Sequence, residues 1–457
     1  MAHSRPFIHG TTLIAAIAAL CSSCSTDKGA EAQRAAVPPP PKPWTVMVFM
    51  NGKNNLEQDA LDNFRQMASV PRPSDNLNLV VEFGRLKKGS PTDADWGGVK
   101  RYLVKNGSQS TASTAVMDLA DARANTDMGA PATLSDFLEW SRANYPAQHY
   151  MLVIWNHGQG WRIQTLQDIG KRSMFVRSQL ALTEIENVSV VGGYRAASYD
   201  DETGNFLYNS DIEEQLKKWS AAGPRLDVIG FDACLMAMIE TGYAFRDVAS
   251  VMVGSQELEP GSGWDYSKWL PGLVSNPSMS GQELASAIVE SYKSVYGDSG
   301  ETTLSAVGLD KIPGLVQAMK DFATALKGKL AREVKKIREA RKGCTAYGDR
   351  SPDTPFVDLK QFLLKYAALT TDQALKAQAQ RVIDLLAAPA ILDNYASEKR
   401  KGNYGSYGVS IYFPSDKAAF NADHYHRGYV AGNTDHRVDY VDDGGWADFL
   451  QAYLNAR

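Results

Sequence analysis

The chain has 457 residues, a hydrophobic content of 44%, a charged content of 22% and a formal net charge of −4. These values are those of an ordinary globular protein, and the length allows one large core or two modest ones. The slightly negative charge gives no electrostatic case for nucleic acid as a partner, and no internal stretch is long and apolar enough to cross a bilayer.

The N-terminus predicts export. A basic residue precedes the largely apolar run 7–20, and Cys21-Ser-Ser-Cys24 follows that run. This order is typical of a bacterial signal peptide, and the small residues before Cys24 resemble a lipoprotein cleavage box. We therefore expect residues 1–24 to be a signal and Cys24 to be lipidated, which anchors the protein to the membrane of the cell envelope. A secreted form without lipid and an uncleaved anchor are the alternatives. Residues 25–43 are rich in Ala and Pro and predict a stiff linker.

Strand and helix patterns alternate through residues 44–280, which we expect to be the main core. Thr133 is expected to cap one of the helices. Strands separated by helices favour a mostly parallel β-sheet with helices on both faces, which is an α/β fold. The predicted strands are 46–50, 79–83, 101–104, 150–155, 226–231 and 251–254, and the predicted helices are 56–67, 133–140 and 211–219.

Residues 281–457 are expected to complete the fold as a C-terminal α/β extension. Helical patterns fill 280–345, interrupted by a strand at 303–309, and return at 358–386. A late strand at 408–413 and a closing helix at 446–454 follow.

Two predicted strands end next to a reactive side chain. Strand 150–155 is followed by His157 and Gly158. Strand 226–231 is followed by Cys234. Open α/β sheets place their ligand sites beyond the carboxyl ends of strands, so we expect the two segments to meet. An imidazole beside a thiol forms an activated nucleophile, so Cys234 is predicted to attack and His157 to act as base and acid.

The surroundings of this pair carry further expectations. The stretch 235–243 has helical spacing, which predicts that Cys234 lies at a helix N-terminus, where a thiolate is stabilised. Gly158 lets a substrate backbone approach closely. The alternatives are a buried structural cysteine and a strand-end histidine with a local hydrogen bond. Cys344 is expected to be incidental. The weaker candidates for the base are His149, His424, His426 and His436, of which His424 and His426 also have the spacing of a metal pair.

These segments resemble the clostripain family of cysteine endopeptidases, in the same broad group as caspases, gingipains and legumain. The resemblance implies a caspase-like α/β fold, a His–Cys dyad and cleavage of protein or peptide substrates after Arg or Lys. The chain departs from the family at Gln159, within the glycine run after the histidine, but keeps Gly158. The matching segments are 44–52, 150–161, 227–243, 255–266 and 408–414.

Residues next to the proposed dyad also have predicted roles. The backbone N–H groups of Gly158 and Cys234 are expected to form the oxyanion hole. Preference for basic residues needs a carboxylate, and Asp232, two residues before the nucleophile, is the first choice. Its alternative role is to cap a helix that begins near Ala233. The next candidates for substrate binding are Glu257 and Glu259.

A long polar segment, 162–209, separates the two halves of the pair. Loops of this length are usually functional or disordered. Relatives are activated by a cut after the histidine-bearing strand, so Lys171, Arg172 and Arg177 are predicted sites of self-cleavage. The alternative is a solvated basic loop.

No cofactor is certain, and the resemblance leaves calcium open. Asp200, Asp201 and Glu202 are the candidate ligands, although the EF-hand spacing is absent. The sequence thus predicts an exported cysteine endopeptidase that cleaves after basic residues. The rival interpretations are an inactive peptidase-like surface binding protein and a cysteine-dependent amidase or transpeptidase.

Overall fold

In the computed structural model all the described residues lie in one compact unit, Pro38–Arg457. They are 40–71, 76–87, 96–119, 127–158, 160–161, 198–297, 301–348, 355–387, 389–397, 405–423, 426–433 and 437–456. The predicted signal, most of the linker, Cys24, Lys171, Arg172 and Arg177 lie outside the described residues. No described helix has the length and hydropathy that a bilayer crossing requires.

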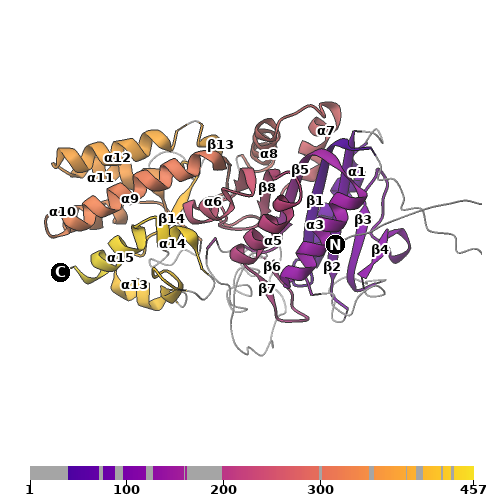
Figure 1. Cartoon of the computed structure of the whole chain (residues 1–457), viewed down its shortest axis with the longest axis horizontal. Helices are drawn as coiled ribbons and strands as arrows, with labels where there is room; N and C mark the ends of the chain where they lie inside the picture. Colours follow the sequence, from indigo (N-terminus) through magenta and orange to yellow (C-terminus); the bar gives the residue numbers. More distant parts are fainter. Residues whose placement is uncertain are drawn as a thin grey trace, which may run out of the picture. The chain divides into compact units, whose positions relative to one another are not determined.

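A nine-stranded sheet is the centre of the fold (Figure 1), with the spatial order β13-β10-β9-β8-β5-β1-β2-β3-β4. The five inner strands, from β9 to β2, run parallel, and the strands on either side of them run antiparallel. The expected mostly parallel core is confirmed. In chain order the strands are β1 (Lys42–Gly52), β2 (Leu77–Arg85), β3 (Gly98–Leu103), β4 (Met117–Asp118), β5 (Ala147–Trp155), β8 (Leu226–Asp232), β9 (Ala249–Gly254), β10 (Thr303–Gly308) and β13 (Ile391–Ala396).

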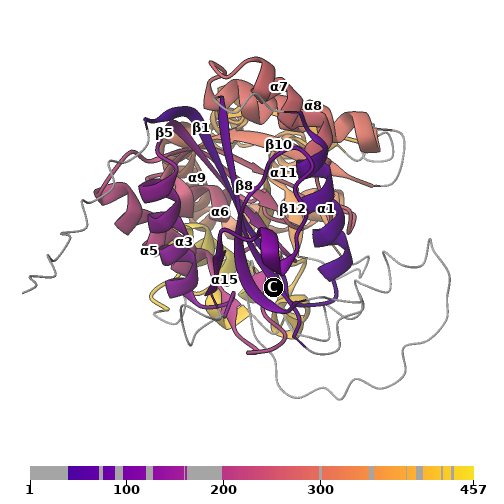
Figure 2. The same ribbon diagram turned by 90° about the vertical axis from the view of Figure 1, so that its right-hand side faces the viewer.

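Both faces of the sheet are buried, which explains the continuous apolar runs in its strands. Met47 and Phe49 of β1 belong to one hydrophobic cluster, whereas Val46 and Val48 belong to another on the opposite face. Figure 2 shows α3 and α5 on one side of the strands and α1 on the other. The first face packs against α3 (Pro131–Asn144), α5 (Asn209–Ala221) and α6 (Ile239–Phe245), and the second against α1 (Glu57–Ser69), α7 (Tyr266–Ser275) and α8 (Gly281–Tyr296).

The C-terminal part shares this core. Its buried residues, such as Phe322, Phe362 and Trp446, belong to the same cluster as the α3 face of the sheet. In Figure 1 the orange helices α9 to α12 lie beyond the β13 edge. Its elements are α9 (Ile312–Gly328), α10 (Leu330–Lys342), α11 (Leu359–Leu369), α12 (Gln373–Leu385), α13 (Lys417–Ala422), α14 (Asp439–Asp443), α15 (Trp446–Asn455) and an antiparallel sheet of β11 (Ala346–Tyr347), β12 (Phe356–Asp358) and β14 (Ser410–Tyr412).

One predicted helix start is wrong. Helix α3 begins at Pro131, and its N-cap is Ala130 rather than Thr133. Proline is favoured at the first helical position because it has no N–H to satisfy there. Thr133 lies in the first turn, where its hydroxyl donates to the carbonyl of Asp127 at 2.6 Å.

The direction of the winding reverses between β1 and β5. From β1 the chain moves outward to β2, and from β5 it moves to β8 and β9 on the other side. Ligands of open α/β sheets bind at the carboxyl ends of strands beside such a reversal. The segments after β1, β5, β8 and β9 are therefore the place to look for a site.

Candidate active site

The segments that follow β5 and β8 are in direct backbone contact. The strands pair in parallel with Trp155 opposite Asp232, and the N–H of Asn156 donates to the carbonyl of Asp232 at 3.3 Å. A Cβ built on Gly158 would lie 2.2 Å from the carbonyl oxygen of Cys234 and 2.8 Å from its nitrogen. The residue directly after His157 thus packs on the backbone of Cys234. Gly158 is required by this contact, in addition to any approach of substrate.

Cys234 lies on a turn and not at the start of a helix, so that expectation is wrong. Helix α6 begins only at Ile239. Leu235 has φ of 63°, which a right-handed helix does not allow. The N–H of Leu235 donates to the carbonyl of Glu257 at 3.1 Å, and that of Ala237 to Ser255 at 2.8 Å. The segment after β8 therefore pairs with the segment after β9.

The thiol rests on the backbone of the segment after β9. Its Sγ accepts the N–H of Glu259 at 3.2 Å and lies 3.8 Å from the carbonyl oxygen of the same residue. A backbone donor directed at sulfur favours the thiolate, as a helix N-terminus would. Cys234 is half-buried, which leaves part of it accessible.

His157 is buried, with 7% of its surface exposed, and both its ring and its backbone are held. Nε2 lies 2.9 Å from Oδ1 of Asn55, in the segment that follows β1. The backbone N–H donates to Oδ1 of Asn156 at 2.6 Å. Sequence reasoning missed Asn55. The available signal was a group of asparagines directly after an apolar strand, at 51, 54 and 55.

Two buried carboxyl groups belong to the segments around the thiol, Asp232 two residues before Cys234 and Glu259 in the segment that contacts its sulfur. Asp232 accepts the N–H of Trp264 at 3.1 Å and the hydroxyl of Tyr266 at 2.9 Å. Desolvation by burial raises the pKa of Asp232 to about 7. Burial, followed by the charges of Asp232 and Cys234, raises the pKa of Glu259 well above its usual value. The alternative that Asp232 caps a helix at Ala233 is wrong, because α6 has Met238 as its N-cap.

Glu257 differs from this pair in its contacts. Its Oε1 accepts the N–H groups of Leu258 and Gly348, both at 2.9 Å. The side chain is 3% exposed and fixes the end of β11 to the segment after β9. We therefore assign Glu257 a role in holding this segment.

Of the other candidate histidines, the structure describes His149 and His426, and both contact partners elsewhere in the fold. His149 lies near the start of β5, at the end of the strand opposite to His157, and its Nδ1 is 2.9 Å from Oδ1 of Asp227. Nδ1 of His426 lies 2.6 Å from the carbonyl of Asp423. His424 and His436 are outside the described residues.

Cys344 is a free thiol like Cys234 but has a different environment. Its Sγ lies 3.1 Å from the carbonyl oxygen of Ala340, which it contacts as a donor. Burial raises its pKa to about 12, so the thiol stays protonated near neutral pH. This supports the interpretation of Cys344 as incidental.

Two of the three acids considered for calcium, Asp200 and Glu202, contact a lysine instead, and Asp201 bonds to Tyr199. Nζ of Lys53 lies 2.8 Å from Oδ2 of Asp200 and 2.9 Å from Oε2 of Glu202. The ammonium group takes the place that a metal cation would occupy, so these residues do not fit a calcium site. Among the described residues no group of three His, Cys, Asp or Glu side chains could hold a metal ion.

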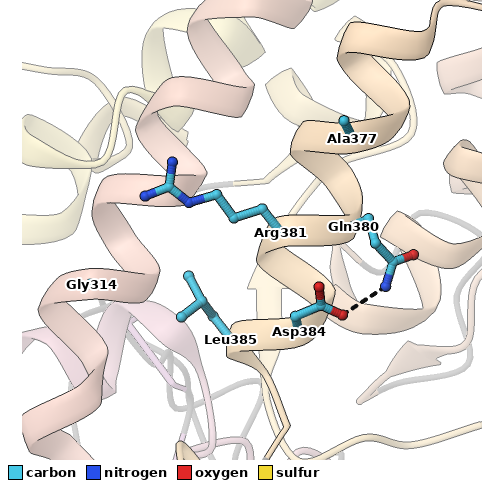
Figure 3. A pocket seen from close by; sticks show the side chains of 6 residues that line it. All are labelled: Gly314, Ala377, Gln380, Arg381, Asp384 and Leu385. Atoms are coloured by element: carbon cyan, nitrogen blue, oxygen red, sulfur yellow. Dashed lines mark hydrogen bonds between the residues drawn. The ribbon is translucent and has the colours of Figure 1, made fainter.

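A hollow of about 490 Å³ lies between α9 and α12 (Figure 3). Within it Gln380 donates to Asp384 at 2.8 Å, and no residue of the candidate site lines it. We therefore do not assign it to the reaction. Its lining residues are Gly314, Ala377, Gln380, Arg381, Asp384 and Leu385.

Comparison with known proteins identifies the family and supports the fold. A family described as the clostripain family matches residues 48–453. The chain belongs to the clostripain family. Clostripain of Hathewaya histolytica is 24% identical over 238 residues, which are 49% of this chain and 41% of that protein. The match thus spans less than half the length of this curated relative.

Two solved structures show the same fold. An inactive zymogen C11 protease from Parabacteroides distasonis is 18% identical, with a TM-score of 0.57 over 83% of this chain and 94% of that one. A secreted C11 cysteine protease from Bacteroides thetaiotaomicron, solved with an irreversible peptide inhibitor, is 20% identical, with a TM-score of 0.55 over 89% of this chain and 99% of that one. The α/β fold implied by the resemblance is confirmed.

Proposed function

We propose that this member of the clostripain family is a cysteine endopeptidase that cleaves after Arg or Lys, with Cys234 as nucleophile and His157 as its base and acid. The observation that carries the proposal is the backbone contact between Gly158 and Cys234 at the carboxyl edge of the sheet. It brings the imidazole-bearing and thiol-bearing segments together, as an activated nucleophile requires.

The reaction follows from this arrangement. His157 takes the thiol proton as the sulfur of Cys234 attacks the substrate carbonyl, and the N–H groups of Gly158 and Cys234 stabilise the resulting oxyanion. His157 then gives the proton to the leaving amine, and an acyl-enzyme remains. Water, deprotonated by His157, attacks the thioester, so that the carboxylic acid product leaves and the thiol is restored.

Asp232 and Glu259 supply the negative charge for a basic substrate side chain. Both are buried, and the charge of Cys234 acts on that of Glu259. A substrate guanidinium or ammonium group would relieve the cost of their ionisation. Because the pKa of Asp232 is raised to about 7, its charge is lost as the pH falls through neutrality. Basic substrates should therefore bind more weakly in acid.

Reporter peptides ending in Arg, Lys or Asp test the reaction and its specificity together. We expect hydrolysis of the Arg and Lys reporters, no hydrolysis of the Asp reporter, and a KM for the Arg reporter that rises as the pH falls below about 7. Asp232→Asn should raise that KM about tenfold or more and flatten its pH dependence, since one charge is removed.

The controls separate this proposal from its rivals. Cys234→Ala should be inactive on every reporter. Wild type without hydrolysis would favour an inactive binding protein, and products that carry the peptide on a second amine would favour a transpeptidase. Hydrolysis of the Asp reporter at the rate of the Arg reporter would contradict the specificity.

Self-cleavage at Lys171, Arg172 or Arg177 belongs to the same proposal. Purified wild type should separate into two fragments on a denaturing gel, whereas Cys234→Ala should stay intact because it has no nucleophile. Replacing all three basic residues with Gln should also keep the chain whole. A wild type that hydrolyses reporters without ever splitting would contradict self-activation.

Export with a lipid on Cys24 completes the proposal. The Bacteroides thetaiotaomicron relative is described as secreted, which is consistent with an exported enzyme. The mass of the mature N-terminal peptide distinguishes a lipidated Cys24 from an unmodified one.

A further inference from the structure

We propose that Asn55 is the positioning residue of the dyad, and that its side-chain carbonyl decides which nitrogen of His157 takes the thiol proton. The inference rests on the proposed roles of His157 and Cys234. The observation behind it is the distance of 2.9 Å between Oδ1 of Asn55 and Nε2 of His157. The two residues are 102 positions apart, and the contact joins the segments after β1 and β5.

The chemistry follows from the donor and acceptor inventory. A side-chain carbonyl oxygen only accepts, so Nε2 must carry the hydrogen of the neutral ring. Nδ1 is then the unprotonated nitrogen, and in this proposal it is the one that accepts the proton of Cys234. Once His157 is protonated, the same contact becomes charge-assisted and stronger. Asn55 thus fixes the tautomer before proton transfer and stabilises the imidazolium after it.

The segment that carries Asn55 is held firmly on both sides. Oδ1 of its neighbour Asn54 accepts the N–H of Leu56 at 2.9 Å, and Nδ2 of Asn54 donates to the carbonyl of Tyr199 at 3.1 Å. Helix α1 begins at Glu57, directly after this turn. A positioning side chain works only if its own backbone is fixed, and these contacts meet that condition.

The backbone of His157 is fixed independently of Asn55. Asn156 accepts the N–H of His157, and its Nδ2 donates to the carbonyl of Asn51 at 2.6 Å. Asn51 in turn donates to the carbonyl of Tyr199 at 2.8 Å. Loss of the Asn55 contact should therefore release the ring but leave its place in the fold unchanged. We expect an effect on kcat with little change in KM.

Two substitutions of Asn55 test the assignment. Asn55→Leu removes the acceptor and should lower kcat about 10- to 100-fold, by analogy with the loss of a hydrogen-bond partner that orients a metal-binding histidine. Asn55→Asp keeps an acceptor for Nε2 and should recover most of that loss. Nuclear magnetic resonance of Cys234→Ala protein with labelled histidine should show the Nε2–H tautomer of His157. Adding Asn55→Asp to this protein should raise the pKa of His157, and adding Asn55→Leu should give a mixture of tautomers.

Asn54→Leu is the matched control, because it breaks hydrogen bonds in the same segment without touching His157. It should lower the thermal midpoint but keep the Nε2–H tautomer. An Nδ1–H tautomer of His157 in Cys234→Ala protein that keeps Asn55 would overturn the inference. So would a wild-type kcat in Asn55→Leu, or equal losses of kcat in Asn55→Leu and Asn55→Asp. Activity that survives His157→Ala would instead overturn the proposed dyad, while the tautomer measurement would still report on the Asn55 contact.

Discussion

Replacing Gly158 with alanine is expected to lower kcat/KM for an arginine reporter about 100- to 1,000-fold, the cost of displacing a catalytic group or losing an oxyanion donor. The new Cβ would lie 2.2 Å from the carbonyl oxygen of Cys234 and 3.0 Å from the carbonyl carbon of Ala233. Both are backbone atoms at the end of a central strand, so they cannot move aside cheaply. The substitution must push the His157 segment away from the thiol.

Gly314→Ala is the matched control for this variant. Nothing lies within 4 Å of a Cβ at position 314, which is in the first turns of α9. It should keep full activity and gain up to about 1 kcal/mol of stability, since alanine is the better helix former. The measurement is reporter kinetics together with a thermal unfolding curve for each variant. Gly158→Ala with activity within tenfold of wild type would contradict the account of this contact.

Replacing Lys53 with methionine is expected to destabilise the fold by about 3–5 kcal/mol, the cost of leaving buried charges without their partner. The ammonium group is 1% exposed and contacts Asp200, which is fully buried, and Glu202. Oδ2 of Asp200 also accepts the N–H of Met128 at 3.0 Å, so this carboxylate cannot turn towards solvent without losing a second bond. The loss should appear as a lower midpoint in thermal and denaturant unfolding.

The exposed ion pair of Lys218 and Glu214 on α5 provides the comparison. Their side chains are 59% and 63% exposed, and Lys218→Met should cost at most about 1 kcal/mol. Adding Asp200→Asn to Lys53→Met should recover part of the loss, because one of the unpaired charges disappears. A Lys53→Met variant as stable as Lys218→Met would show that the buried ion pair contributes little.

The strands that build the site were predictable because each is a continuous apolar run between polar segments. Strands β1, β5, β8 and β9 were all predicted within four residues of their ends. Strands buried on both faces need hydrophobic residues at every position, so the run is visible without any knowledge of the partners. The predicted positions of His157 and Cys234 after their strands follow from the same signal.

The turn after Cys234 could not be predicted in this way. Residues 239–243 do lie in helix α6, as their spacing indicates, but the buried apolar residues 235–238 before them do not. N–H groups of this turn pair with carbonyls of the segment after β9, which is distant in sequence. The bridge between Met238 and Ser410 adds a second distant partner. Such contacts override local spacing and leave no periodic trace.

Asn55 was missed for a related reason. An asparagine after a strand usually indicates a turn, and Asn54 does support one here by accepting the N–H of Leu56. Only the fold shows that the next asparagine faces a histidine from another strand. The sequence predicted Asp232, Glu257 and Glu259 as substrate-binding acids. Only the three-dimensional contacts show that Asp232 and Glu259 form a pair, whereas Glu257 binds the backbone of Gly348.

The most direct test of the account is to locate the residue that reacts with a thiol-reactive peptide probe ending in arginine. We expect mass spectrometry of the digested adduct to place one probe on Cys234 and none on Cys344, with labelling abolished in His157→Ala. A probe found on Cys344, or equal labelling with and without His157, would contradict the central claim that His157 activates Cys234.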